Sequence, residues 1–374
     1  MAELGSTGQA TDAARRPRAG YIDWMRGLAV LIMILAHVVD SWTVAGAARK
    51  TLEYFWFMVL AGMGAPLFLW LAGLAVPLAA HARMRRGATL AQASRGLQTR
   101  GWQIFGLAIL FRLQAYVFSA GASFYGILKV DILNVMGLSL VAAAWLWGRG
   151  RTPRVRVATA IAATLGVLIL SPLLRVWSWP ALVPDPLEWY LRPHPGRTTF
   201  TLFPWGAFVL AGLAHGEWLA STAAQYRGRF HAWCVGGGAA LGCGSYLLSF
   251  VPTLLPGSNY WTTSPAFFGV RLGAIIAVFG LLYFLLQPGG LWARVSVPRA
   301  WSPMELFGRT SLFIYWVHVE LAYGLPSRPL HKALSFGAAV FACAIFTLGM
   351  LALAMAKSRY WDHETPWRRL HAES

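Results

Sequence analysis

Long apolar stretches separated by short polar connections make up most of the chain. Each stretch is close to twenty residues long, and a helix of that length spans a hydrocarbon core of about 30 Å. The pattern predicts about ten membrane-spanning helices and therefore an all-α, polytopic membrane protein. The predicted spans are residues 21–44, 56–80, 102–121, 131–147, 157–177, 199–220, 231–253, 264–287, 304–325 and 334–356.

The first stretch carries four ionisable residues, Asp23, Arg26, His37 and Asp40. At about 100° per residue, all four fall on one face of a helix, and Arg26 and His37 lie roughly 16 Å apart along its axis. Ionisable groups in a bilayer are costly unless they face protein, water or a partner. The face is therefore either an interior path for reaction or transport, or a structural network that pins one helix to another.

His37 is the main candidate for a catalytic group on this face. A neutral imidazole accepts a proton from an attacking hydroxyl or amine near neutral pH. Asp40, one turn further on, would fix the tautomer of the imidazole and stabilise its cationic form. Arg26 would meet a phosphate or an oxyanion. The spacing of Arg26 and His37 alone is weak evidence, because a chain with 32 basic residues contains such pairs by chance.

The stretch at 304–325 is a second polar candidate. Ser311, Tyr315 and His318 are four and three residues apart and share one helix face. His318 either lines a pocket for an acceptor or closes a hydrogen-bond network, and the sequence favours neither reading.

Further polar and aromatic residues stand at the predicted outer ends of two stretches. Asp131 and Asn134 open the stretch at 131–147, and Trp205 follows a proline that is also a normal helix start. The predicted substrate-binding set is Asp131, Asn134, Trp205, Tyr315 and His318.

Three more arginines, Arg112, Arg175 and Arg271, fall within or at the end of predicted spans. Each is expected to pair with a carboxylate or with an anionic group of a ligand. The candidate carboxylates are Asp131, Glu217 and Glu305.

Composition supports the membrane class, since 57% of the residues are hydrophobic and only 12% are charged. A soluble domain carries about 25% charged residues. The three cysteines form no pattern typical of a metal site or a disulfide framework, and no metal is predicted. We expect a disordered cytoplasmic segment at 1–20, one membrane domain at 21–356 and a cytoplasmic tail at 357–374.

The net charge of +18 raises nucleic acid as a partner, but the placement of the basic residues argues against it. With the N-terminus in the cytoplasm, most basic residues fall in inner connections, as the positive-inside rule requires, and both termini are cytoplasmic. Either the basic residues of these connections only fix the orientation of the protein in the membrane, or some of them also bind an anionic cytosolic ligand. They contain Arg15, Arg16, Arg18, Arg83, Arg85, Arg86, Arg95, Arg100, Arg149, Arg151, Arg154, Arg156, Arg227, Arg229, Arg294, Arg299, Lys357, Arg359, Arg368 and Arg369.

Two other segments have a predicted role. The longest outer connection, 178–198, is rich in proline and tryptophan, and it is either a rigid lid over a cavity or an interfacial anchor. In the segment GGGAALGCG at 236–244, Gly238 and Gly242 allow close helix packing.

Five ordered blocks resemble motifs of the heparan-alpha-glucosaminide N-acetyltransferase-like membrane proteins. They are DWMRGLAVLIMILAH (23–37), APLFLWLAGLAV (65–76), GILKVDILNVMGLSL (126–140), LFPWGAFVLAGLAHG (202–216) and GRTSLFIYWVH (308–318). The first block also resembles the Arg-x10-His signature of the acyltransferase 3 family, which Arg26 and His37 match. Lysosomal members of the first family carry asparagine at the place of His37 and a proposed catalytic histidine in the following loop, where this chain has Ala48. In the 126–140 block, Val135 stands where the lysosomal pattern has an arginine.

The resemblance implies a multi-pass protein of the bacterial inner membrane that moves an acyl group, in the first instance acetyl, from cytoplasmic acyl-CoA to an acceptor at the outer face. The acceptor would be a glycan or glycolipid, attacked through a sugar amine or hydroxyl with His37 as general base. Basic residues would hold the phosphates of CoA. The predicted cofactor-binding set is Arg26, Arg83, Arg85, Arg86, Arg100 and Arg309.

The rival hypothesis is a proton-coupled secondary transporter or permease of a small polar solute or sugar, because intramembrane Asp, His and Arg residues also form proton relays. The concentration of polar residues in the first span and the ordered blocks favour the enzyme. The sequence leaves open the acceptor, the choice between N- and O-acylation and the oligomeric state.

Overall fold

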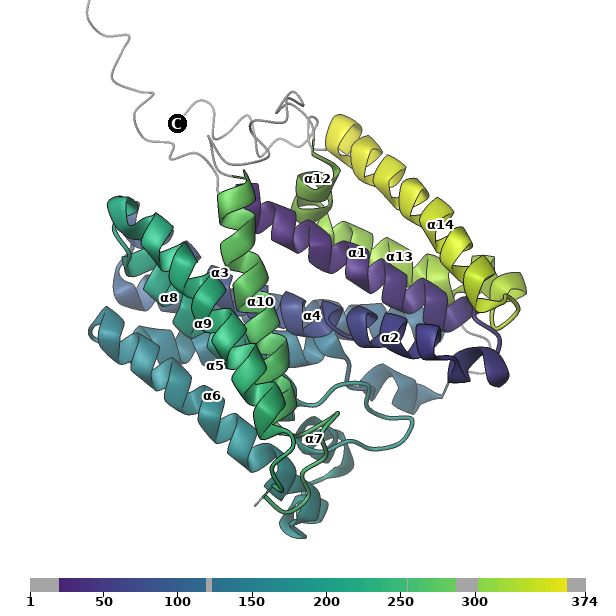
Figure 1. Cartoon of the computed structure of the whole chain (residues 1–374), viewed down its shortest axis with the longest axis horizontal. Helices are drawn as coiled ribbons and strands as arrows, with labels where there is room; N and C mark the ends of the chain where they lie inside the picture. Colours follow the sequence, from purple (N-terminus) through teal and green to yellow (C-terminus); the bar gives the residue numbers. More distant parts are fainter. Residues whose placement is uncertain (1–19, 119–122, 254, 287–301, 362–374) are drawn as a thin grey trace, which may run out of the picture.

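The computed structural model describes residues 20–118, 123–253, 255–286 and 302–361, and most of these are helical (Figure 1). In these ranges there is no regular strand, only the isolated bridges Thr43–Leu334 and Val130–Thr198. The first helices are α1 (Gly20–Trp42), α2 (Leu52–Ala61), α3 (Gly64–Arg85), α4 (Leu90–Phe118), α5 (Ile132–Arg149), α6 (Pro153–Val176) and α7 (Asp185–Leu191). They are followed by α8 (Leu202–Ser221), α9 (Arg227–Leu248), α10 (Pro265–Leu286), α12 (Pro303–Arg309), α13 (Ser311–Tyr323) and α14 (Phe336–Ala356).

Six of the described helical segments are long and apolar enough to cross a membrane. They are α1, the α2–α3 pair taken together, α5, α6, α10, and α14 with its continuation to Tyr360. The predicted all-α, polytopic membrane fold is confirmed. α1 begins, α10 ends, α12 begins and α14 ends at one end of the molecule, the top of Figure 1. The total of ten spans and the cytoplasmic location of both termini stay predictions.

Three predicted spans differ from the observed helices. The stretch at 56–80 is broken between Ala61 and Gly64, and the stretch at 304–325 is broken at Thr310. The stretch at 102–121 is the second half of α4, which begins at Leu90. Hydropathy sums over a window of residues, so it detects neither a one- or two-residue break in an apolar helix nor a polar extension of it.

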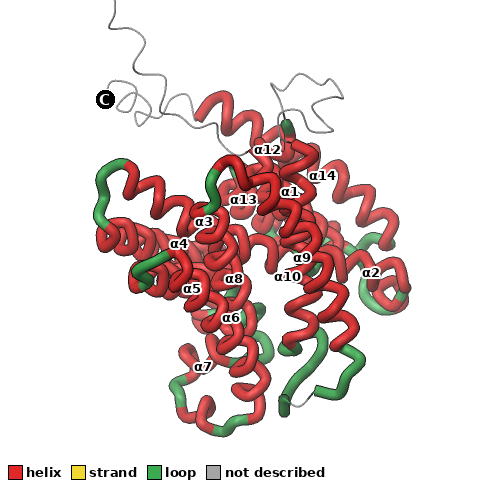
Figure 2. Tube along the Cα trace, turned by 60° about the vertical axis from the view of Figure 1, so that its left-hand side comes forward, coloured by secondary structure: helices red, strands yellow, loops and turns green. Residues whose placement is uncertain are grey.

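α1 is the central helix, because it belongs to both large apolar clusters. Through Met25 and Ala29 it packs on a cluster formed mainly by α3, α4, α5, α8, α9 and α10. Through Val30 and Ile34 it packs on a smaller cluster with α12, α13 and α14. The other main contacts pair α3 with α8, α4 with α5, α6 with α8 and α9 with α10. Figure 2 shows a group of loops beyond the ends of α7, α9 and α10.

Glycine allows the closest helix crossings. A Cβ atom on Gly308 of α12 would lie 1.9 Å from the carbonyl oxygen of Asp23 in α1, and one on Gly27 would lie 1.9 Å from that of Met304. A Cβ atom on Gly238 would lie 2.6 Å from the backbone nitrogen of Ala277, so the predicted small-residue packing brings α9 against α10. Any larger side chain at these positions would push the two backbones apart.

The proline-rich connection at 178–198 contains a short 3-10 turn, Trp179–Leu182, and α7. Trp189 is buried, whereas Trp177 and Trp179 are exposed. Several predictions fall outside the described residues: the segment 1–19 with Arg15, Arg16 and Arg18, the connection containing Arg294 and Arg299, and the tail from 362 to 374.

Candidate active site

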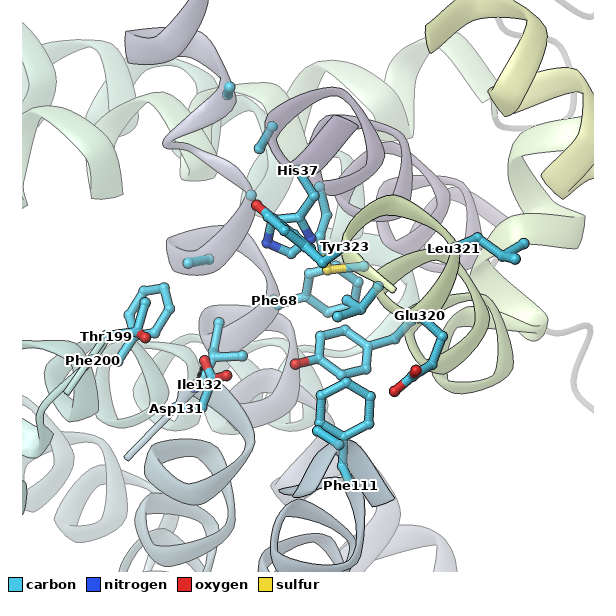
Figure 3. A pocket seen from close by; sticks show the side chains of 18 of the residues that line it. His37, Phe68, Phe111, Asp131, Ile132, Thr199, Phe200, Glu320, Leu321 and Tyr323 are labelled. Atoms are coloured by element: carbon cyan, nitrogen blue, oxygen red, sulfur yellow. Dashed lines mark hydrogen bonds between the residues drawn. The ribbon is translucent and has the colours of Figure 1, made fainter. Parts of the chain in front are cut away.

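A cavity of about 970 Å³ lies between α1, α3, α4, α5, α8, α10 and α13 (Figure 3). One part of its wall carries His37 and Tyr323 side by side, and Asp131, Thr199 and Phe200 lie across the open space. Its charged lining residues are Arg112, Lys129, Asp131, Arg271, Glu320 and Arg328. The cavity therefore combines an imidazole, charged groups and aromatic rings inside a membrane protein, as expected for a binding or reaction site.

A chain of hydrogen bonds fixes the proton positions on His37. The carbonyl oxygen of Ile314 only accepts, so the Nδ1–H of His318, with a nitrogen–oxygen distance of 2.7 Å, donates to it. In the neutral ring, Nε2 of His318 is then an acceptor, and it lies 2.9 Å from Nδ1 of His37. Nδ1 of His37 therefore donates, and its Nε2 keeps a lone pair without a hydrogen-bond partner among the described residues. This protonation state is the one that a general base requires.

The two predicted polar faces, on the first stretch and on the stretch at 304–325, therefore meet in the structure. His318 is fully buried behind His37, which lines the cavity. Tyr323 lies edge-on to His37 with ring centroids 5.6 Å apart, and Tyr315 lies edge-on to His318 at 5.8 Å. The Oγ of Ser41 donates to the carbonyl of Ala322 over 2.8 Å. The contacts of His37 with His318 and Tyr323 and that of Ser41 with Ala322 join α1 to α13, so α13 holds the imidazole in place.

Asp40 has other partners. Its Oδ1 accepts from Nη1 of Arg49 over 3.0 Å and from the hydroxyl of Tyr54 over 3.3 Å. Asp40 is absent from the residues that line the cavity described above. The structure thus gives the Nδ1–H of His37 an acceptor on α13, His318, in the place where the sequence suggested Asp40.

Asp131 joins α4 to α5 at the cavity wall. It caps the N-terminus of α5, where Asn134 completes a capping box, and it forms an ion pair with Arg112. Asn134 is buried and its side-chain nitrogen lies 3.4 Å from the hydroxyl of Tyr190. Of the predicted substrate-binding set, Asp131, Trp205 and Tyr315 line the cavity, whereas Asn134 and His318 support its wall.

The other two candidate carboxylates are also paired. Glu217, fully buried, accepts from Nη1 of Arg156 over 3.2 Å and from the indole of Trp147 over 2.8 Å, and His81 lies 3.0 Å away. Glu305 pairs with Arg309 over 3.0 Å. Arg175 and Arg271 pair with no carboxylate among the described residues. Arg271 lines the large cavity, and Arg175 lines a second, polar cavity of about 500 Å³.

The predicted cofactor-binding arginines fall into two groups at the predicted cytoplasmic side. Arg26 pairs with Asp23 over 3.1 Å, and Arg309 lies 3.9 Å from the same carboxylate where α1 crosses α12. The other group consists of Arg83 and Arg85 in the last turn of α3, Arg86 directly after it, and Arg100 in the first half of α4. Neither group lines the cavity that contains His37.

Several cavity residues were not in any predicted site. Glu320 and Tyr323 were hidden in an apolar stretch, and Lys129, Thr199 and Arg328 stand in connections that only the folded chain brings together.

The family model for the catalytic region of heparan-alpha-glucosaminide N-acetyltransferase matches residues 18–248, more than half of the chain. The match runs from α1 to α9 and includes His37, Arg112, Asp131 and Trp205. It ends before α10 and α13, which supply Arg271 and the partner of His37. A comparison with curated proteins found no match.

Proposed function

The chain belongs to the heparan-alpha-glucosaminide N-acetyltransferase family, and on that premise we propose that it moves an acetyl group from cytoplasmic acetyl-CoA to a sugar amine or hydroxyl at the outer face. The observation that carries this proposal is the His37–His318 pair at the cavity wall, because it leaves the Nε2 lone pair of His37 open to a substrate. The membrane is the bacterial inner membrane in this proposal.

In the reaction, the acceptor lies in the cavity with its amine or hydroxyl hydrogen directed at Nε2 of His37. His37 takes this proton as the acceptor nitrogen or oxygen bonds to the acetyl carbonyl carbon. The carbon–sulfur bond of the thioester then breaks, and CoA leaves as the thiol after taking a proton from His37. The imidazole returns to its neutral form, so the cycle needs no other reactant.

His318 acts on the reaction through His37. Its Nε2 accepts the Nδ1 hydrogen of His37 and thereby excludes the tautomer whose Nε2 is protonated. This is the role that a carboxylate has in other nucleophile–base arrangements. Asp40, held by Arg49 and Tyr54, is left with a structural role at the end of α1.

We propose that CoA binds through its phosphates at the end of α3 and along the first half of α4. Arg83, Arg85, Arg86 and Arg100 pair with no carboxylate in the described part of the chain, so their guanidinium groups remain available to an anion. Arg26 and Arg309 share Asp23 and Glu305, which makes them weaker candidates for the same role.

The discriminating experiment uses purified protein in lipid vesicles with acetyl-CoA labelled in the acetyl group. The proposal predicts release of CoA and labelling of glucosamine, both dependent on the acceptor. A His194→Gln protein is a matched control, because His194 lies in an exposed outer connection away from the large cavity. Uptake of glucosamine into vesicles without acetylation would instead support the transporter.

A further inference from the structure

Arg271 is a cation in a membrane-spanning helix with no carboxylate partner among the described residues. Arg112, Arg156 and Arg309, by contrast, each form an ion pair with an acidic side chain. An unpaired charge at membrane depth is costly, and such residues face a cavity or a ligand when they occur. Arg271 does line the large cavity, in the second turn of α10.

The surroundings of Arg271 hold its guanidinium group in a defined place. Its Cζ atom lies 3.9 Å from the ring centroid of Phe267 and 5.8 Å from that of Trp205. One of its terminal nitrogens would lie 3.6 Å from a Cβ atom added to Gly62, which also lines the cavity. Aromatic faces attract a guanidinium group but leave its N–H donors unused. The donors of Arg271 are therefore available for a planar anion such as a carboxylate, or for a phosphate.

The charge of the whole cavity points the same way. Its wall carries four basic residues, Arg112, Lys129, Arg271 and Arg328, and two acidic residues, Asp131 and Glu320. Arg112 and Asp131 neutralise each other in their ion pair. The remaining wall has three cations for one carboxylate, so a ligand that fills the cavity gains from carrying negative charge.

We propose that the acceptor carries an anionic group, a phosphate or a carboxylate, and that Arg271 binds this group while the reacting amine or hydroxyl lies at His37. This inference rests on the proposed function and narrows it, because it excludes a simple neutral or cationic sugar as the preferred acceptor. Trp205, beside Arg271 in the wall, offers its ring to the sugar.

The binding test uses purified full-length protein in detergent and measures affinity for glucosamine 6-phosphate and for glucosamine. A charge-assisted hydrogen bond contributes about 1.5–3 kcal/mol. The wild-type protein should therefore bind the phosphate form roughly 10- to 100-fold more tightly, at about 1.4 kcal/mol per tenfold change. Arg271→Gln should abolish this preference, and Arg271→Lys should restore part of it.

Arg197→Gln is the matched control variant. Arg197 also lies over aromatic rings, 4.6 Å from the centroid of Tyr125, but it does not line the large cavity. Its substitution should leave the preference unchanged. Equal affinity of the wild type for both sugars, or equal loss in the Arg197→Gln and Arg271→Gln proteins, would overturn the proposal. Thermal unfolding of each variant shows whether it is folded.

Two further comparisons are needed. The first shows whether the anionic group belongs to a lipid-linked or a water-soluble acceptor, and the second distinguishes failure of this inference from failure of the proposed function. Tighter binding of dodecyl phosphate than of glucosamine 6-phosphate would identify a lipid-linked acceptor, and the reverse a water-soluble one; both support an anionic acceptor. Loss of CoA binding in Arg271→Gln with sugar binding intact would assign Arg271 to the donor and refute the inference. Arg271-dependent binding without acetyl transfer to any acceptor would refute the proposed function and leave the anion site standing.

Discussion

Residues 18–248, which match the family, and two helices beyond them, α10 and α13, contribute different parts of the same cavity. The matched region provides His37 and the Arg112–Asp131 pair. The region beyond it provides His318, which binds His37, and Arg271, a cation of α10 with no carboxylate partner in the described chain.

We infer from this division that the proposed base and the groups that control it lie in separate parts of the protein. The proposed base belongs to the part that the family model describes, whereas the acceptor of its Nδ1 hydrogen lies on α13 and the cavity cation Arg271 lies on α10. We therefore expect substitution of His37 to remove the proton transfer itself, and substitutions of His318 and Arg271 to alter the efficiency and the selectivity of the reaction.

The largest effect is expected from substitution of His37 in the matched region. His37→Ala and His37→Gln should lower the rate of acetyl transfer by about 10²- to 10⁴-fold, the usual contribution of a general base. Initial rates with saturating labelled acetyl-CoA measure this. Wild-type rates at equal protein levels would remove His37 from the mechanism.

A smaller effect is expected from substitution of His318, the hydrogen-bond partner of His37 in the region beyond the family match. His318→Leu removes the acceptor of the His37 Nδ1 hydrogen and should reduce kcat by about 10- to 100-fold, from a lost buried hydrogen bond and a mixture of tautomers. KM for the acceptor should change little, because His318 is behind the cavity wall. His318→Gln offers a side-chain carbonyl to the same hydrogen and should recover part of kcat; a purely structural role predicts no such recovery.

The packing of α12 on α1, which joins the two regions, can be weakened by a substitution that leaves His37 and His318 unchanged. Gly308→Leu would force α12 away from α1, because a Cβ atom added at position 308 would lie 1.9 Å from the Asp23 carbonyl oxygen. Overpacking of this kind costs about 1–3 kcal/mol, so the midpoint of thermal unfolding in detergent should fall. Gly349→Leu on α14 is the control, because its added Cβ meets nothing within 4 Å. Equal destabilisation by both would contradict a tight crossing at Gly308.

The smallest effect is expected from Asp40. Since its carboxylate is held by Arg49 and Tyr54, Asp40→Asn should change the transfer rate by less than about threefold, within the weight of one partly exposed ion pair. The assay used for His37 measures it. A loss as large as that of His37→Ala would return Asp40 to the catalytic group.

The sequence was sufficient for the membrane class, the helical fold and the candidate polar faces, because hydropathy and helical period depend on neighbouring residues. It also marked both His37 and His318. It did not show that these histidines meet, since they are 281 positions apart and only the packing of α1 on α13 joins them.

The partners of the charged residues were beyond the sequence for the same reason. The choice of Arg112 for Asp131 and of Arg156 for Glu217 depends on which helix ends lie together. Hydropathy also concealed the breaks at Gly62 and Thr310, which set the direction of α3 and α13.

The most direct test of the account is a cryo-EM structure of the protein with CoA and glucosamine 6-phosphate bound together. The account predicts the sugar amine within about 3.2 Å of Nε2 of His37, the hydrogen-bond range of a general base, and the His37–His318 contact intact. A sugar bound away from the cavity, or an imidazole whose Nε2 faces only protein or lipid, would contradict it.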